Sequence, residues 1–330
     1  MNATPVDSAA IADRRRRWMW RIIKWGLCAA VLLFVGLRAR ELWQTDDLRE
    51  ITVSPQWVVA AAAAYLAGWL PSAWFWRRVM AAFGERVTFA DAARAYFCGH
   101  LGKYFPGKAG VLLIRAGMLK GRGHSAAVAA VTATFETLLM MGAGLAIGLA
   151  LFPLTNWPPA IARRIPHPAM MPLGIVVAVG VSLPVIAFLL RNLAAMMTPR
   201  DLAGEKRVEK VDVKLVLLGL GVFCLSWPLH GLSLGCTLAA FDPDLFDLRD
   251  WPMWTGAVAL SASVGFLAIF APGGIGVREG LLMEILRIQP AVGERPAVIA
   301  ALLLRLVWVS AEILAAAGLY WLGGKRRSDD

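Results

Sequence analysis

The chain has 330 residues, of which 58% are hydrophobic and 17% are charged, and its formal net charge is +11. This apolar content is too high for one soluble core, and several stretches approach or exceed the roughly 20 residues that cross a bilayer. Composition therefore excludes a soluble globular protein and predicts an all-α polytopic membrane protein. The basic residues cluster at the ends of the apolar stretches, which favours anionic lipid head groups over nucleic acid as their partner.

Six apolar stretches are predicted to span the membrane. In chain order they cover residues 22–37, 57–80, 126–151, 170–190, 215–240 and 298–322. A run of arginines from Arg14 to Arg17 precedes the first stretch, and the small-residue cleavage site of a secretory signal is missing. We therefore expect the first helix to remain in the protein, with its N-terminus in the cytoplasm.

Two further segments carry a repeated Pro-Gly motif. They read YFPGKAGVLLIRAG from Tyr104 and FAPGGIGVREG from Phe270. Proline lacks an N–H group and glycine adopts backbone angles that other residues avoid, so each motif should end one helix and begin another, near Gly110 and near Gly276. Unpaired backbone groups cannot face lipid. We therefore predict two re-entrant segments buried in the protein, at about 88–118 and 252–288.

The distribution of basic residues predicts the topology. If only the six stretches cross, the segments 1–24, 77–122, 191–214 and 323–330 share one side and hold 24 Lys and Arg, whereas the loops on the other side hold 7. The positive-inside rule places the first set, and both termini, in the cytoplasm. Charge counting does not separate a shallow re-entrant pair from a full helical hairpin.

The two motifs align as parts of an internal repeat with an offset of 166 residues. The matched positions are Pro106 with Pro272, Gly107 with Gly273, Gly110 with Gly276, and Val111 with Val277. The span after each motif contains the pattern ExLxxxG, which begins at Glu136 and at Glu312. Each half has an odd number of crossings, so we predict an inverted-topology repeat whose broken helices meet near the midplane. The expected divisions are a basic cytoplasmic tail at 1–20, a first membrane repeat at 21–165, a second at 166–322, and a cytoplasmic tail at 323–330.

An anion site is predicted where the new helices begin. A helix N-terminus offers free N–H groups and a partial positive charge, and basic side chains flank both starts, so together they could hold a phosphate. The candidate substrate-binding residues are Lys103, Lys108, Arg115, Arg278, Glu279, Gly107, Gly110, Gly273, Gly274 and Gly276. Two alternatives stay open. The cations could reach lipid head groups at the membrane surface, and Glu279 could simply neutralise Arg278.

Three charged residues lie deep inside predicted spans: Glu136, Arg305 and Glu312. A charge there costs roughly 2.5 to 3.5 kcal/mol on insertion scales, so each is expected to have a partner. Arg305 and Glu312 lie two turns apart on one helix face, and we expect Arg305 to pair with Glu136 of another helix. A structural ion pair and a role in binding head groups or protons are equally compatible with this pattern.

No cofactor or metal is expected. The four cysteines and four histidines lack metal-ligand spacing. The stretch from Gly102 to Ala109 resembles a P-loop, but Ala109 stands where that loop needs a hydroxyl, which argues against nucleotide binding.

Two patterns concern packing. Gly144 and Gly148 form a GxxxG pattern, which indicates close helix packing or dimerisation. The aromatic cluster of Trp69, Trp74, Phe75 and Trp76 precedes two arginines, and we interpret it as an anchor at the membrane interface.

The chain resembles the lysylphosphatidylglycerol synthase transmembrane-region family of flippase-like membrane proteins. The resemblance covers roughly residues 20 to 322 and rests on KYFPGKAG with Arg115, the span with Glu136, APGGIGVREG, and the last span with Arg305 and Glu312. It implies a multi-pass protein of the bacterial inner membrane that moves or handles a lipid head group. It also implies a candidate site made of Lys108, Arg115, Glu136, Arg278 and Glu279.

The chain departs from that family in two respects. Thr137 and Met140 stand where the family often carries Arg and Asp, so an ion network built on those residues is not expected. The soluble aminoacyl-transfer domain of the synthases is not evident either, so lysine transfer is not expected.

The sequence therefore predicts a flippase-like transporter, not an enzyme, for an anionic phospholipid or a polyprenyl-phosphate-linked lipid. The alternative is a non-transporting accessory or regulatory protein of a lipid-modifying enzyme or glycosyltransferase. A homodimer or a complex with a membrane enzyme is compatible with either. The lipid, the direction of movement, the coupling ion and the oligomeric state stay open.

Overall fold

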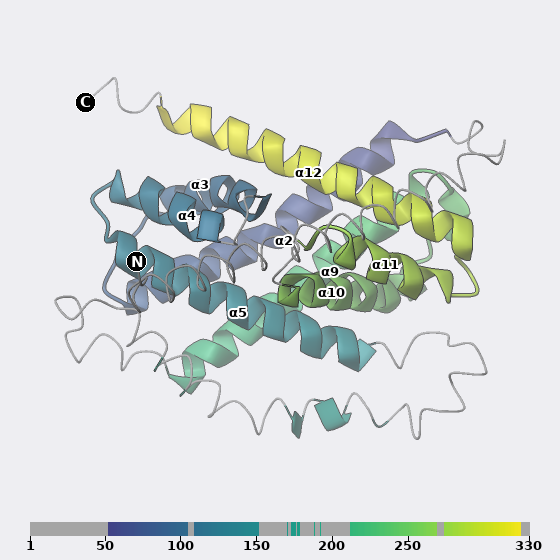
Figure 1. Ribbon diagram of the computed structural model, residues 1–330, viewed down its shortest axis with the longest axis horizontal. Helices are drawn as coiled ribbons and strands as arrows, with labels where there is room; N and C mark the ends of the chain where they lie inside the picture. Colours follow the sequence, from purple (N-terminus) through teal and green to yellow (C-terminus); the bar gives the residue numbers. More distant parts are fainter. Residues whose placement is uncertain are drawn as a thin grey trace, which may run out of the picture.

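The computed structural model describes residues 52–104, 109–151, 212–268 and 274–324, together with a few isolated positions between 170 and 192. The secondary structure of these four continuous ranges is helical, and the helices pack together (Figure 1). The elements are α2 (Pro55–Ala82), α3 (Phe89–His100), η2 (Leu101–Tyr104), α4 (Ala109–Lys120), α5 (Ala126–Leu151), α9 (Val213–Ala239), η5 (Pro243–Leu245), η6 (Leu248–Asp250), α10 (Trp251–Leu267), α11 (Val277–Arg287) and α12 (Glu294–Gly324). The predicted span at 22–37, most of that at 170–190, and both Pro-Gly dipeptides lie outside the described residues.

Four of the described helices are long and apolar enough to cross a membrane: α2, α5, α9 and α12. They correspond to the predicted spans at 57–80, 126–151, 215–240 and 298–322, so a long apolar helix is confirmed at each of these four places. Local chemistry explains two of their starts. Pro55 occupies the first turn of α2, where its missing N–H is not needed, and the Asp212 carboxylate accepts a hydrogen bond from the Leu215 N–H at 2.9 Å at the start of α9.

The predicted helix starts after the Pro-Gly motifs are also confirmed. Helix α4 begins at Ala109 and α11 begins at Val277, next to the expected glycines. Gly276 has a φ of 86°, which favours glycine, and its N–H donates to the Glu279 Oε2 at 2.6 Å. At the other break, a Cβ on Gly102 would lie 2.3 Å from the backbone of Gly110. Only glycine therefore allows the chain to pass itself so closely.

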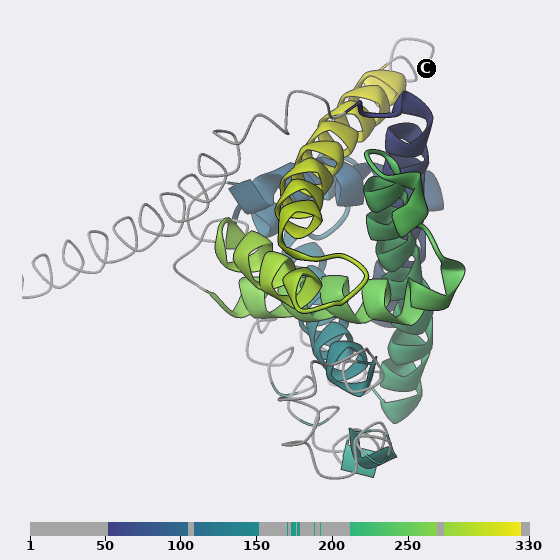
Figure 2. The same ribbon diagram turned by 90° about the vertical axis from the view of Figure 1, so that its right-hand side faces the viewer.

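The long helices form a bundle with a short helix pair at each end. Figure 1 shows α3 and α4 at one end and α10 and α11 at the other, with α12 running along both. Helices α2 and α9 lie side by side (Figure 2) and run antiparallel, since the Ser54 N–H donates to the Ala240 carbonyl at 2.7 Å while Ser72 and Ser226 meet further along.

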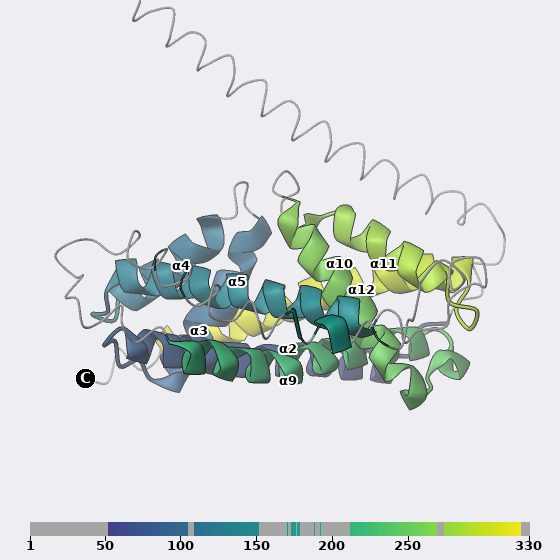
Figure 3. The ribbon, with the colours of Figure 1, turned by 90° about the horizontal axis from the view of Figure 1, so that it is seen from below.

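The packing of the two halves is reciprocal. Helix α5 of the first half packs against α10 of the second, and α12 of the second half packs against α3 of the first. Seen from below, the two short pairs approach each other above α5 (Figure 3). The described residues on either side of the two breaks thereby come together around one cavity.

The GxxxG pattern mediates packing within the chain. A Cβ on Gly144 would lie 2.4 Å from the Trp227 ring of α9, and a Cβ on Gly148 would lie 2.8 Å from Leu260 of α10. These glycines therefore let α5 approach α9 and α10 closely. The face they occupy is covered by the protein itself.

The interpretation of the aromatic cluster as an interfacial anchor is wrong for most of its members. Phe75 and Trp76 are fully buried, and Trp76 donates a hydrogen bond from Nε1 to the Thr132 hydroxyl at 3.1 Å. Trp69 packs edge-on against Tyr65 inside the bundle. Trp74, which is 36% exposed, is the member that faces outward. Consecutive helical residues point in different directions, so only part of such a cluster can face outward.

Candidate functional site

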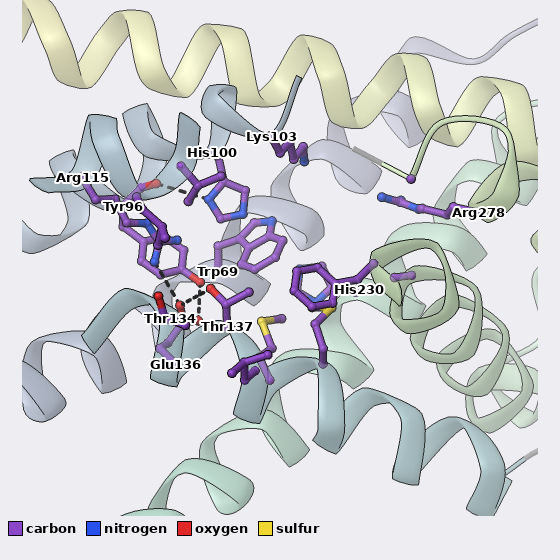
Figure 4. Close-up of a pocket in the computed structure, with 18 of the residues that line it drawn as sticks. Trp69, Tyr96, His100, Lys103, Arg115, Thr134, Glu136, Thr137, His230 and Arg278 are labelled. Atoms are coloured by element: carbon purple, nitrogen blue, oxygen red, sulfur yellow. Dashed lines mark hydrogen bonds and ion pairs between the residues drawn. The ribbon is translucent and has the colours of Figure 1, made fainter. Parts of the chain in front are cut away.

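A cavity of about 270 Å³ lies between the two breaks. Figure 4 shows side chains from both halves of the chain around it. Its lining residues are Trp69, Tyr96, His100, Lys103, Val111, Leu112, Arg115, Thr134, Glu136, Thr137, Leu138, Met140, Met141, Trp227, His230, Ala262, Phe266, Gly274, Arg278 and Trp308. The cavity thus joins α2, α3, α4 and α5 to α9, α10, α11 and α12, with mainly apolar walls and three cations.

Arg115, the first of these cations, is neutralised by a carboxylate of the same half. Its Nη1 lies 3.0 Å from Oε2 of Glu136, and both side chains are almost completely buried. Tyr96 donates its hydroxyl to Oε1 of Glu136 at 2.8 Å, and the guanidinium lies 3.8 Å from the centre of the Tyr96 ring. Gly99 makes room, since a Cβ there would lie 2.5 Å from the Arg115 Cγ. The pair is therefore held rigidly in a tightly packed setting.

Lys103, the second cation, is paired across the two halves. Its ammonium group contacts Oε1 of Glu312 on α12, and the Tyr65 hydroxyl donates to the same carboxylate oxygen. The Tyr104 hydroxyl donates to Oε2 at 2.8 Å. Glu312 is 2% exposed and so receives a cation and two hydroxyl donors from the first half. This group, the Glu312 cluster, ties η2 and the middle of α2 to α12.

The expected pair of Arg305 with Glu136 is wrong. Arg305 lies 3.5 Å from Oε1 of Glu279, within the second half, while Glu136 binds Arg115. Helix α12 does present Arg305 and Glu312 on a shared face, because the Tyr104 ring lies 5.2 Å from the Arg305 guanidinium while its hydroxyl binds Glu312. The pairing was missed because the sequence does not show which helices face each other.

Arg278, the third cation, has no acidic partner: no carboxylate of the described residues lies within ion-pair distance of it. Glu279, expected as a possible neutraliser, binds the Gly276 N–H and Arg305 instead. The Arg278 guanidinium stacks 4.0 Å from the centre of the Trp308 ring. Since the other two cations on the wall are paired, the described lining of the cavity carries one surplus positive charge, at Arg278.

The predicted binding residues divide into three groups. The structure brings Lys103, Arg115, Arg278 and Gly274 to the cavity wall, together with Glu136 of the predicted charge network. Near the breaks, but not among the lining residues, are Gly110, Gly276, Glu279, Arg305 and Glu312. Outside the described residues are Lys108, Gly107 and Gly273.

Several lining residues were not predicted, above all His230 and three tryptophans, Trp69, Trp227 and Trp308. Trp227, His230 and Trp308 lie in apolar helices, and Trp69 belongs to the aromatic cluster of α2; in such settings a histidine or tryptophan is more often a packing residue than a ligand. One signal was present for His230: Gly68 lies opposite it, and a Cβ there would lie 2.9 Å from the imidazole ring. That signal needs the pairing of α2 with α9 to be known.

One wall of the cavity reaches the outer surface of the described helices. Leu138 of α5 lines the cavity and is 39% exposed, and the neighbouring Thr137 and Met141 are partly exposed. The cavity therefore adjoins the surface that a bilayer would cover.

In the parts of the chain described here, no group of three or more His, Cys, Asp or Glu gathers where it could hold a metal ion. The arrangement instead offers cationic, aromatic and hydrogen-bonding groups around a cavity that adjoins the apolar surface. Such groups bind a ligand by charge and hydrogen bonds.

Comparison with known families gives a match over most of the chain. The model of the lysylphosphatidylglycerol synthase TM region matches residues 21–315, which include every described element of the site. A comparison with curated proteins found none that matches the chain. Four apolar helices and the family match identify a multi-pass membrane protein. The chain belongs to the lysylphosphatidylglycerol synthase TM region family.

Proposed function

We propose that this protein is a flippase-like transporter that moves an anionic, phosphate-bearing lipid or lipid-linked intermediate across the bacterial inner membrane. The main support is the position of Arg278. This arginine lies on the wall of a cavity between the two halves and has no acidic partner among the described residues. A cation held in apolar surroundings is stabilised by an anionic ligand. The family name points to a membrane protein that handles lipids, which agrees with this reading.

The architecture that we propose has six spans, two re-entrant pairs and an inverted repeat, with both termini in the cytoplasm. Helices α3, α4 and α11 have 12, 12 and 11 residues, which is less than the roughly 20 that cross a bilayer. Helix α5 packs against α10, and α12 packs against α3. A twofold axis that relates the two halves would produce this pair of contacts. The antiparallel pairing of α2 with α9 has the same symmetry.

In the proposed cycle, the phosphate binds Arg278 while the acyl chains stay in the bilayer beside Leu138. The two halves then rock about the cavity and expose it to either side. The Glu312 cluster joins the two halves through its contacts with Lys103 and Tyr104. A rocking motion must therefore either break these contacts or move the contacting residues together. We propose transport without chemical conversion of the lipid, so the protein is not an enzyme in this scheme.

Reconstitution in vesicles tests the proposal. Arg278→Ala should slow the movement of a fluorescent anionic phospholipid by about tenfold or more, since a charge-assisted contact of 1.5 to 3 kcal/mol is lost. Arg287→Ala is the matched control, because Arg287 lies on the same helix but is exposed and pairs with Glu284. Equal rates for the wild type and Arg278→Ala would remove Arg278 from the mechanism.

The same preparation separates a transporter from an accessory protein. Lipid movement by the purified chain alone supports transport. A protein that moves no lipid, and that co-purifies with one membrane enzyme at fixed stoichiometry, would instead be an accessory subunit.

A further inference from the structure

Four buried polar atoms at the cavity have no hydrogen-bond partner with good geometry among the described residues. They are Nε1 of Trp69, Nε of Arg115, and Nδ1 and Nε2 of His230, and all three side chains line the cavity. Buried polar groups in proteins are nearly always paired, because an unpaired one has lost its water without a replacement. A ligand that pairs with these atoms would remove that cost.

His230 is the most informative of these residues. It is 1% exposed, and its ring lies 4.8 Å from the Trp69 ring and 5.8 Å from the Trp308 ring, centre to centre. Gly68 leaves the space that the imidazole fills. The ring is therefore positioned by packing, with the Ser226 backbone beside one of its nitrogens, and the other nitrogen has no partner among the described residues. A neutral imidazole that donates from one nitrogen accepts at the other, so a ligand hydroxyl can donate to it.

His230 lies between Arg278, the cation without an acidic partner among the described residues, and Trp69, whose indole N–H is unpaired there. Trp308 stacks on Arg278 on one side of it, and Trp69, with its free indole N–H, lies on the other. Figure 4 shows His230 in the space between Trp69 and Arg278. A ligand with its charge at Arg278 would therefore extend its uncharged part along His230 toward Trp69.

The charges limit what that uncharged part can be. Lys103 and Arg115 are each matched by one carboxylate, so Arg278 leaves room for a single negative charge. A head group with an additional ammonium would place it in a cavity whose surplus charge is already positive. The aromatic walls would attract such a cation, but the three basic side chains beside them oppose it.

We propose that the site selects a lipid with one phosphodiester charge and an uncharged head group that carries hydroxyls. The phosphodiester binds Arg278, and the hydroxyls pair with His230 and the Trp69 N–H. This inference rests on the proposed function, because it assumes that the cavity receives a phosphate-bearing lipid.

The test compares short-chain lipids that differ only in the head group, bound to the purified full-length protein in mild detergent. Phosphatidylglycerol and phosphatidylethanol both carry one negative charge, but only the first carries hydroxyls. We expect the wild type to bind phosphatidylglycerol about tenfold more tightly, the effect of one to two added hydrogen bonds. Equal affinities, or tight binding of zwitterionic phosphatidylethanolamine, would overturn the inference.

Two variants locate the preference. Trp69→Phe keeps the ring but removes the N–H, and it should lower the preference for phosphatidylglycerol by about threefold. His230→Leu should remove most of it, with phosphatidylethanol binding unchanged as evidence of a folded site. Trp254→Phe is the matched control, since its buried indole N–H is also unpaired but does not line the cavity. Full preference in Trp69→Phe and His230→Leu would contradict the proposal.

Arg278→Ala separates this inference from the function on which it rests. It should weaken both lipids equally and leave their ratio unchanged. If it weakens neither, the phosphate site fails, whatever the head-group preference. If it weakens both while the wild type shows no preference, the phosphate site stands and the selection fails. Glycerophosphoglycerol, which lacks acyl chains, should bind at least tenfold more weakly than the lipid. Equal binding would assign the site to a soluble phosphodiester and overturn the choice of a lipid.

Discussion

The two broken segments of this protein share a motif but differ in how their cations are used. In the first, Arg115 is enclosed by Glu136, Tyr96 and Trp76. In the second, Arg278 stacks on Trp308 and lacks an acidic partner among the described residues. The cation at the first break thus belongs to a structural ion pair, whereas the cation at the second break is arranged as in a binding site. A repeated motif can therefore supply the same backbone break twice while, among the described residues, the two copies use their cations differently.

The largest expected effect breaks the enclosed side of this comparison. Glu136→Ala leaves Arg115 buried without a carboxylate, so the free energy of unfolding should fall by about 3 to 5 kcal/mol. Thermal unfolding in detergent measures it. Glu284→Ala removes the acid of an exposed pair on α11 and should cost less than about 1 kcal/mol. Similar losses in both variants would show that the buried pair is not special.

A smaller effect is expected from crowding the same pair. A Cβ on Gly99 would lie 2.5 Å from the Arg115 Cγ, so Gly99→Ala should destabilise the protein by about 1 to 3 kcal/mol. Gly117 lies on α4 with nothing within 4 Å of its Cβ position and serves as the control. Gly117→Ala should be neutral or stabilising, because alanine favours helix. If Gly99→Ala is equally benign, Arg115 is less tightly held than its contacts indicate.

A third variant leaves the first break, like the second, with a cation that no carboxylate of the described residues neutralises. Glu312→Gln keeps the size of the side chain and one acceptor oxygen for the tyrosine hydroxyls but removes the charge that neutralises Lys103, which adds a second surplus cation to the cavity. The affinity for an anionic lipid should rise by about threefold to tenfold at low ionic strength. Lipid titration at two salt concentrations measures this. An unchanged affinity would show that Lys103 does not sense the bound anion.

An effect of similar size concerns how Arg278 is held. Arg278→Lys keeps the charge but loses the planar group that stacks on Trp308 and binds a phosphate through two N–H groups. Lipid binding should weaken by about threefold to tenfold, less than in Arg278→Ala. Binding measured in parallel for the wild type and both variants gives the order. A lysine variant as strong as the wild type would reduce the role of Arg278 to its charge alone.

Much of the framework could be predicted from the sequence. The four described spans, the helix starts at the two breaks and the importance of Arg115, Glu136 and Arg278 follow from apolar length and from charges in apolar surroundings. The pairing of Arg305 was predicted wrongly, and His230 was missed as a lining residue. Both errors concern which helix faces which, because a residue's partner on another helix is not encoded by its neighbours in the chain.

The sequence by itself determined where helices span and where they break, because apolar length, proline and glycine act locally on the backbone. Only the tertiary structure decided which charges neutralise each other. Glu279 lies next to Arg278 in the chain yet binds Arg305, and Glu312 receives Lys103 and Tyr104 from the other half. A buried charge is stabilised by whatever group the packing brings within reach. That packing leaves Arg278 without a carboxylate partner, and one nitrogen of His230 without a hydrogen-bond partner, among the described residues at one cavity. The packing therefore decides where a ligand can bind.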